Sequence, residues 1–293
     1  MESLFEPFCG AGGMGLGFSS FFNIQYAVDK ESFAVKTYQA NHPDCQVKQC
    51  DVGNVSGARG DFNGVAGVIG GPPCQPYSLL NLKKDLNDPR RKLTGEFMRL
   101  VGEIKPRFFV LENVPYTPTE TKHMVAKVAG EFGYYVTSVY VNAADFGAAQ
   151  YRKRWIAVGV KGKRWSLPLP CKPLTVRDAF SGVRENWGLM QSKPEKLKQL
   201  ENTVVGEWRS VSNGAFKNGI RLSWDMPSPA VVNLQKVYMV HPEELRNISL
   251  AEAAALQGFP CWYVWLGNKR DVGQMIANAM PVQLAYMVAQ TLA

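Results

Sequence analysis

A cysteine and a glutamate are the residues in this sequence best suited to covalent chemistry. Cys74 lies in GGPPCQPYS (70–78), behind two prolines that fix two backbone φ angles and remove two N–H donors. Glu112 lies in VLENV (110–114), at the end of an apolar run. A cysteine hydrolase usually takes its base from a histidine, so this pair does not resemble one. A thiolate beside a carboxylic acid suits attack on an electron-poor ring, with Glu112 holding or protonating a ring nitrogen.

A glycine-rich stretch, FCGAGGMGLGF, offers a second kind of chemistry. Gly10, Gly12 and Gly15 fit the pattern G-x-G-x-x-G between a strand and a helix, which lets a ligand approach the backbone. The pattern alone is typical of NAD, FAD or S-adenosylmethionine sites, or of a tight turn. Asp29 ends the next apolar run, where a carboxylate can bind ribose hydroxyls. Asp51, at the end of VKQCDV, could accept a bond from an adenine amino group. Together these residues favour an adenosine-containing cofactor.

These residues need a parallel sheet to bring them together. Over the first 160 residues, the apolar runs SLFEPF, IQYAV, VAGVIGG, RFFVLEN and YYVTSVYV alternate with the amphipathic stretches SFAVKTYQANH, GEFMRLVGEI and ETKHMVAKVAGEF. This alternation predicts an α/β fold with a Rossmann-like, doubly wound, mainly parallel sheet, and RWIAVGV (154–160) is its expected last strand. Cys74 and Glu112 each follow a predicted strand, so we expect both side chains to face one crevice.

The sequence changes character after residue 161. The following segment is rich in Pro, Lys, Ser, Asn and Trp, and only EKLKQL is clearly helical. Near the end, SLAEAAALQGF and QMIANAMPVQLAYMVAQTLA read as strong helices, and the last is apolar enough to return to the sheet. We therefore predict one domain from residues 1–161 plus 263–293, interrupted by a smaller domain at 162–262.

Composition narrows the function classes. The 293 residues carry a formal net charge of +8, and residues 161–220 hold eleven Lys or Arg against five Asp or Glu. This clustering favours a polyanion-binding lobe, with a solvated basic surface as the alternative. Six cysteines without a C-x-x-C pair and three histidines argue against a zinc site or disulfide framework. Without an apolar span or a signal-like N-terminus, we expect an intracellular protein and no membrane partner.

The motifs and their order resemble the bacterial-type DNA (cytosine-5)-methyltransferase family. The resemblance covers nearly the whole chain through FCGAGGMGLGF, GGPPCQPYS, VLENV, QYRKRW, DMPSPAVV and ANAMPVQ. PPCQ followed by ENV and then by Q-x-R-x-R is a specific signature. The resemblance implies a class I S-adenosylmethionine-dependent fold whose smaller domain recognises the target. It also implies methyl transfer to C5 of cytosine in a specific sequence of double-stranded DNA, with S-adenosylhomocysteine as product and no metal.

The resemblance also assigns catalytic roles. It implies that the Cys74 thiolate adds to C6 of a cytosine flipped out of the duplex. Glu112 would bind N3 and the exocyclic amine, Arg154 would lie near O2, and Arg152 would lie near the nucleophile. C5 then takes the methyl group, and loss of the C5 proton with elimination frees the thiol. The segment 78–93 resembles the family's mobile catalytic loop.

A further set of residues matches the family's cofactor site. Phe8 corresponds to the residue stacked on adenine, Asp29 to the ribose acid and Asn278 to the residue at the cofactor carboxylate. The other matching residues are Gly10, Ala11, Gly12, Gly13, Lys30, Asp51, Val52, Pro73 and Leu93. Three departures stand out: Glu6, Pro7 and Cys9 replace the commoner residues of the first motif, Lys30 replaces an apolar or aromatic residue, and Arg91 replaces a loop glycine.

Other functions fit the motifs less well. A tRNA cytosine-5 methyltransferase of the same family would use the same residues, although the tripeptide CFT associated with that branch is missing. A dehydrogenase needs neither PPCQ nor QYRKR, and a non-catalytic nucleic-acid-binding relative would be expected to lack Cys74 or Glu112. We expect a monomer in the cytoplasm, associated with the nucleoid, with a cognate restriction endonuclease as a candidate partner.

Overall fold

A computed structural model describes most of the chain. The described residues are 1–59, 62–73, 92–189, 194–201, 203–210, 218–232, 234–235 and 237–293. Cys74 and nearly all of the 78–93 segment lie outside them.

The described residues form two compact units. The first comprises Met1–Asn142, Lys153–Leu169 and Leu284–Ala293, and the second comprises Ala143–Arg152 and Pro170–Gln283. These contact-based boundaries differ from the division at 161/162 and 262/263 drawn from the motifs. The assignment of catalysis and target recognition to separate domains stays a prediction.

A seven-stranded sheet forms the first unit. Its strand order is β3-β2-β1-β4-β5-β8-β6, and the strands from β3 to β5 in this order are parallel. β8 is antiparallel to both of its neighbours, β5 and β6. The predicted doubly wound, mainly parallel sheet is therefore confirmed. The strands are β1 (Ser3–Pro7), β2 (Asn23–Asp29), β3 (Gln46–Gln49), β4 (Val65–Gly70), β5 (Phe108–Asn113), β6 (Tyr134–Asn142) and β8 (Lys153–Lys161).

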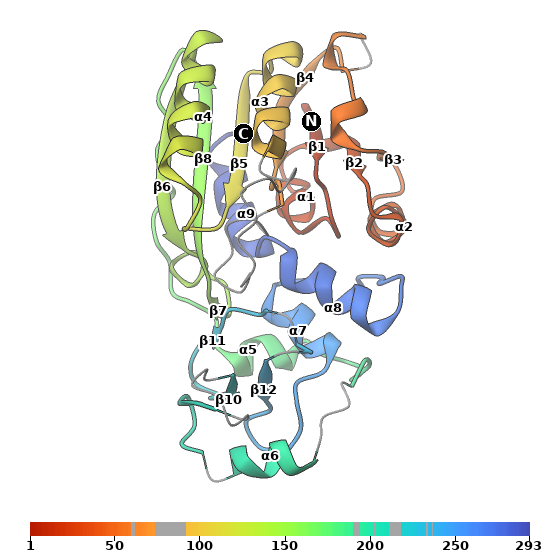
Figure 1. The fold of residues 1–293 in the computed structure, drawn as a ribbon, viewed down its shortest axis with the longest axis vertical. Coiled ribbons are helices and arrows are strands. Elements are labelled where there is room, and N and C mark those ends of the chain that lie inside the picture. The colour runs from red at the N-terminus through yellow and green to blue at the C-terminus, as the bar shows by residue number, and fades with distance from the viewer. Residues whose placement is uncertain are drawn as a thin grey trace. The chain divides into compact units, whose positions relative to one another are not determined.

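Helices cover both faces of this sheet (Figure 1). Right-handed crossovers place α1 and α2 on one face and α3 and α4 on the other. The rings of Phe21 and Tyr286 lie 5.1 Å apart, which brings α9 to the α1 face. All six residues of β5 are buried, as expected for a strand covered on both sides. The helices are α1 (Gly13–Phe18), α2 (Ser32–Asn41), α3 (Leu93–Ile104), α4 (Thr119–Glu131) and α9 (Val282–Gln290), with 3₁₀ turns η1 (Val52–Asn54) and η2 (Gly57–Arg59).

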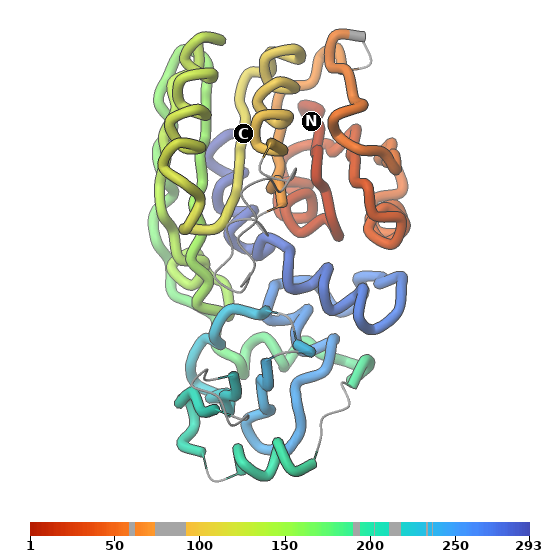
Figure 2. The backbone as a smooth tube through the Cα atoms, in the orientation of Figure 1, coloured from red at the N-terminus to blue at the C-terminus, as the bar shows by residue number. Residues whose placement is uncertain are grey.

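The chain changes direction across the sheet between β1 and β4. Figure 2 shows it running from β1 to the β3 edge, returning to β4 beside β1, and continuing to the opposite edge. In such sheets, ligands bind at the carboxyl ends of the strands that flank this switch. The glycine-rich turn follows β1, and the segment that leads to Cys74 follows β4. The topology therefore directs both predicted functional segments to this point.

The second unit contains short strands and four helices among its described residues. β12, β10 and β9 form one small sheet, and β7 pairs with β11. The elements are η4 (Ala143–Asp145), β7 (Gln150–Tyr151), α5 (Val176–Ser181), α6 (Pro194–Glu201), β9 (Trp208–Arg209), β10 (Gly219–Arg221), β11 (Ser228–Pro229), β12 (Tyr238–Val240), α7 (Leu250–Leu256) and α8 (Lys269–Asn278).

The expected helix over QMIANAMPVQLAYMVAQTLA is wrong in one respect. The structure divides it into α8, which ends at Asn278, and α9, which begins at Val282. Pro281 explains the break, because it lacks an N–H donor and disfavours helical backbone in the residue before it. In the described part of the chain, the helices are too short or too polar to cross a membrane.

Candidate active site

Glu112 and Arg154 meet at the carboxyl end of β5. The antiparallel register pairs Asn113 with Trp155, so Arg154 at the start of β8 lies beside the end of β5. Its Nε lies 2.5 Å from Glu112 Oε1, and the two side chains are only 13% and 11% exposed. In this sparsely hydrated setting, the guanidinium holds the carboxylate in one orientation. The structure therefore brings together Glu112 and Arg154, two residues to which the resemblance assigns catalytic roles.

The segment before Cys74 is packed against β1 and β5. A methyl group on Gly70 would collide with the carbonyl of Pro7, and one on Gly71 would lie 2.8 Å from Glu112 Oε2. Asn113 Nδ2 donates a hydrogen bond of 3.1 Å to the Pro72 carbonyl. Only glycine fits these two close approaches without displacement. The backbone that leads to the predicted nucleophile is thus fixed beside Glu112, while Cys74 itself lies outside the described residues.

The turn after β1 has an unusual backbone. Phe8, Gly10 and Gly12 adopt positive φ angles of 62°, 52° and 85°. A positive φ is costly for Phe8, and its half-buried ring packs against the core. Among the described residues, a Cβ atom built on Gly10 would meet no atom within 4 Å, so there is open space at this position. The backbone of the turn is therefore accessible at Gly10.

Asp29 braces this turn from β2. Its Oδ2 accepts a 2.9 Å bond from the Gly10 N–H, and its Oδ1 accepts a 2.9 Å bond from the Glu31 N–H. Burial raises the pKa of Asp29, although both bonds oppose the rise. Each oxygen retains acceptor capacity for a further donor such as a ribose hydroxyl. Lys30, the next residue, is exposed.

The end of β3 lies beside Asp29. The Cys50 N–H donates to the Asp29 carbonyl at 3.0 Å, which connects the two strand ends. Asp51 follows and caps η1, with Oδ1 accepting from the Gly53 N–H at 2.9 Å. Asp51 is exposed and Val52 is buried, so the pair offers one polar and one apolar contact. These residues line the same end of the sheet as the glycine turn.

Glu6 is a residue whose role the sequence reasoning missed. It is 2% exposed, and it accepts bonds from the Tyr38 hydroxyl at 2.6 Å and from the Gly15 N–H at 3.2 Å. Burial raises its pKa to about 8 against the opposing effect of both bonds. The available signal was a lone carboxylate inside the apolar strand SLFEPF. Its partner Tyr38 lies 32 residues away, so only the fold identifies it.

In the second unit, Gln150 of the Q-x-R-x-R motif is fully buried. Its amide nitrogen donates to the Leu256 carbonyl at 2.9 Å and to Gln257 Oε1 at 2.8 Å. Gln257 in turn donates to the Ile276 carbonyl at 2.5 Å. The glutamines therefore join β7 to the end of α7 and to α8.

Arg152 clamps backbone carbonyls in the same unit. It is 3% exposed and donates to Val231 O at 2.8 Å and to Ala277 O at 2.6 Å. Ala277 precedes Asn278, whose exposed side chain accepts a 2.7 Å bond from Gln274. These contacts give Arg152 a structural role at the end of α8. Its predicted place near the nucleophile stays a prediction.

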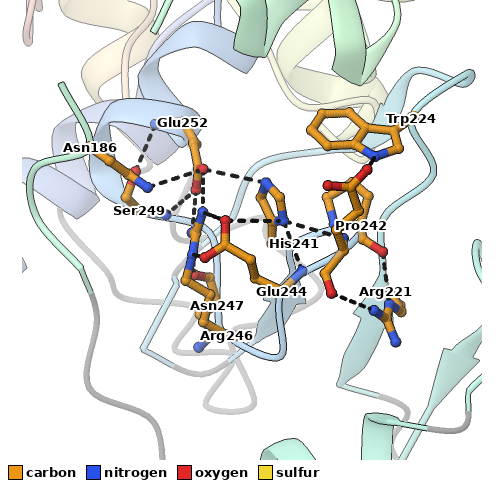
Figure 3. Close-up of polar contacts among 11 residues, drawn as sticks. Asn186, Arg221, Trp224, His241, Pro242, Glu244, Arg246, Asn247, Ser249 and Glu252 are labelled. Carbon is orange, nitrogen blue, oxygen red and sulfur yellow. Dashed lines mark hydrogen bonds and ion pairs between the residues drawn. The ribbon is translucent and has the colours of Figure 1, made fainter. Parts of the chain in front are cut away.

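A partly buried ionic network holds α7 (Figure 3). Glu252 is 4% exposed and forms a capping box with Ser249 at the start of the helix. Arg246 donates two 2.7 Å bonds to the two oxygens of Glu252 and also pairs with Glu244. His241 lies beside this pair, and its Nδ1 accepts two backbone N–H bonds. The helix that presents Leu256 and Gln257 is therefore fixed at its first turn.

Comparison with known proteins decides the family. The family model described as C-5 cytosine-specific DNA methylase matches residues 3–293. The chain belongs to this family. The resemblance found in the motifs is confirmed, and the protein is a DNA (cytosine-5)-methyltransferase that uses S-adenosylmethionine to methylate C5 of cytosine.

The methylase resembles its relatives over most of their length. The type II methyltransferase M1.HphI of Haemophilus parahaemolyticus is 33% identical over 97% of this chain and 85% of that protein. M.MthTI of Methanothermobacter thermautotrophicus is 32% identical over 97% and 94%. A solved E. coli structure, described as a prophage-encoded DNA modification methyltransferase, has 26% identity and a TM-score of 0.78, covering 100% of this chain and 98% of that one. The S. pombe Dnmt2 methyltransferase shares the fold, with 18% identity and a TM-score of 0.71 over 100% and 98% of the chains.

The first unit of the methylase has features that fit the cofactor. The open space at Gly10 lets a ligand reach the backbone, and the Asp29 carboxyl stands next to it with unused acceptor positions. Asp51 and Val52 supply a polar and an apolar surface at the neighbouring strand end. This donor and acceptor set suits an adenosine with its ribose and a zwitterionic tail.

Proposed function

We propose that the methylase acts through a covalent adduct between Cys74 and C6 of a cytosine flipped out of double-stranded DNA. The observation that carries this proposal is the buried Glu112–Arg154 pair with the Gly70–Pro72 backbone packed beside it. A protonated or hydrogen-bonded N3 makes C6 more electrophilic, and Glu112 is the group that performs this task. Arg154, beside Glu112, binds the O2 of the same base.

The reaction balances through the thiol. The Cys74 thiolate forms the S–C6 bond, and the electron pair of the C5–C6 double bond becomes available for attack from C5. When bound, S-adenosylmethionine would supply the methyl group that C5 takes, and its sulfur would leave as the thioether of S-adenosylhomocysteine. Loss of the C5 proton to a solvent base then restores the double bond and expels the thiolate. A free thiol with a pKa of about 8.5 is only a few per cent ionised near neutrality, so a lowered Cys74 pKa would accelerate the first step.

The proposed cofactor site is built mainly around the turn after β1 in the first unit. Phe8 stacks on the adenine, and the backbone from Gly10 through Ala11 and Gly12 to Gly13 approaches the methionine end. Asp29 binds the ribose, while Lys30, Asp51 and Val52 surround the adenine. Pro73 and Leu93 lie near the methyl donor, and Asn278 binds the cofactor carboxylate. The open turn at Gly10 and the acceptor positions of Asp29 support this assignment.

The proposed substrate is a short specific sequence in duplex DNA. The relatives named type II methyltransferases support a role in a restriction-modification system, with a cognate restriction endonuclease acting on the same sequence. The basic segment at 161–220 supports a DNA-recognising second domain. We infer a monomer that works on the chromosome in the cytoplasm.

The test is transfer of labelled methyl from S-adenosylmethionine to matched pools of duplex DNA and tRNA, read at base resolution. Label at C5 of cytosine in one DNA context is expected, and it also identifies the recognised sequence. Cys74→Ser and Glu112→Gln are expected to retain cofactor binding and to lose turnover by at least about a hundredfold. Label in tRNA alone would move the substrate to RNA, and normal methylation by Cys74→Ser would exclude the covalent route.

A further inference from the structure

The helix α1 that follows the cofactor turn is poorly suited to form by itself. Three of its six residues are glycines (Gly13, Gly15 and Gly17), and glycine is the least favourable helix residue after proline. Its N-cap is Gly12 in the left-handed conformation, which provides no side-chain cap. The first-turn N–H groups of such a helix need acceptors from elsewhere. The position of the turn therefore depends on contacts with other elements.

Glu6 supplies one of these acceptors from β1. The N–H of Gly15, the third residue of α1, donates to Glu6 Oε1 at 3.2 Å. A capping residue normally stands directly before its helix, whereas Glu6 lies nine positions before Gly15 and reaches it through the strand. A second carboxylate, Asp29, accepts from the Gly10 N–H at 2.9 Å. The segment from Gly10 to Gly15 is thus held by carboxylates at both ends.

Tyr38 of α2 fixes the Glu6 carboxyl. Its hydroxyl donates to Oε2 at 2.6 Å, and both side chains are at least 98% buried. A methyl group on Gly15 would collide with both Glu6 Oε2 and the Tyr38 hydroxyl, so the three groups leave no spare room. Any change in the Glu6–Tyr38 pair must therefore shift α1 or leave a buried polar atom without its partner.

We propose that Glu6 and Tyr38 are positioning residues for cofactor binding, which set the place of the Gly10–Gly13 turn through the Gly15 N–H. This inference rests on the proposed cofactor site. Glu6 and Tyr38 are buried beneath the turn. They act through the backbone of α1, so their loss weakens the cofactor complex of a protein that is still folded.

The experiment measures S-adenosylhomocysteine binding by calorimetry, at a temperature well below the melting temperature of every variant. Tyr38→Phe is expected to raise the Kd about fivefold, which corresponds to one hydrogen bond of ordinary strength. Glu6→Leu is expected to raise it about tenfold or more. Glu6→Gln is expected to bind within about twofold of the parent, because its amide can accept from Gly15 and face the Tyr38 oxygen.

Two further variants separate the possible outcomes. Tyr134→Phe removes another buried phenol, whose hydroxyl donates to Pro106 O at 2.7 Å near the amino end of β5. It is expected to lower the melting temperature without changing the Kd. A rise in its Kd as large as that of Tyr38→Phe would overturn the proposal. Asp29→Ala tests the cofactor site itself. If Asp29→Ala loses affinity while Tyr38→Phe and Glu6→Leu keep it, the positioning role is excluded; unchanged affinity in Asp29→Ala would refute the cofactor site instead.

Discussion

At the scale of single residues, the first unit uses two buried carboxylates in different ways. Glu112 is paired with Arg154, whose positive charge lies 2.5 Å away. Glu6 is paired with a neutral phenol and a backbone N–H. The Arg154 guanidinium orients the Glu112 carboxyl, whereas neutral donors alone hold the Glu6 carboxyl. Glu112 and Arg154 therefore suit electrostatic work on a base, and Glu6 suits a structural bond.

The planar geometry of Arg154 matters for this electrostatic work. Arg154→Lys keeps the charge but removes the fixed Nε–H that meets Glu112 Oε1. We expect kcat/KM for DNA methylation to fall by about tenfold to a hundredfold, while S-adenosylhomocysteine binding is unchanged. Arg107→Lys, at the opposite end of β5, is the control, because Arg107 contacts Glu2 and the Leu292 carbonyl away from this site. Equal losses in the two variants would contradict a specific role for Arg154.

Glu6 makes stability depend on pH in a defined direction. Its pKa rises from 4.5 to about 8 in the folded protein, mainly through burial. The folded state therefore binds the proton more tightly than the unfolded chain does. The free energy of unfolding that depends on this group is fully present below pH 4.5 and is lost as the pH rises to about 8.

Denaturant unfolding of the parent and Glu6→Gln between pH 5 and pH 9 measures this effect. We expect the variant to gain stability relative to the parent as the pH rises, by on the order of a few kcal/mol across the range. His42, which stacks on Tyr38, has its pKa lowered by burial to about 4, but it is common to both proteins. Asp29, Cys9 and Cys45, the other titratable groups near Glu6, are also common to both. Parallel stability curves would show that Glu6 does not titrate in this way.

At the scale of elements, α7 depends on its first turn. Ser249 is fully buried and accepts from the Glu252 N–H at 3.1 Å, while Glu252 accepts from the Ser249 N–H at 2.7 Å. Ser249→Ala is expected to reduce the free energy of unfolding by about 1 kcal/mol, as for other caps. Glu252→Ala is expected to reduce the free energy of unfolding by about 3–5 kcal/mol, because Arg246 then loses its buried partner.

Thermal melts of these variants test the order of the two effects. Thr175→Ala removes the capping box of α5, whose cap is more exposed, and serves as the matched comparison for Ser249→Ala. A Glu252→Ala variant as stable as Ser249→Ala would mean that the Arg246–Glu252 pair adds nothing beyond the cap. A larger fall in the melting temperature for Thr175→Ala than for Ser249→Ala would contradict the importance of burial at the first turn of α7.

Most helices and strands of the first unit could be predicted from the sequence, whereas contacts between them could not. The strands and amphipathic helices expected over the first 160 residues are predictable because their apolar patterns are local. The expectation of buried strands is wrong for β6, which is a partly exposed edge strand. The break before α9 was missed because the apolar pattern continues through Pro281. Glu112 and Arg154 belong to different motifs, and their contact required β8 to insert antiparallel between β5 and β6. The Glu6–Tyr38 hydrogen bond joins β1 to α2, which are separated along the chain by α1 and β2. No local sequence pattern could predict it.

At the scale of the whole molecule, the positive charge sets a measurable expectation for DNA binding. The net charge of +8 attracts a polyanion before any base is read. If about five phosphates are neutralised, the affinity for a duplex should fall by about two to three orders of magnitude between 50 and 200 mM salt. Fluorescence anisotropy with a labelled duplex measures this slope. S-adenosylhomocysteine has no net charge at neutral pH, so its affinity should change little over the same range. A flat salt dependence for DNA would mean that contacts to bases and sugars, and not the basic residues at 161–220, dominate the binding energy.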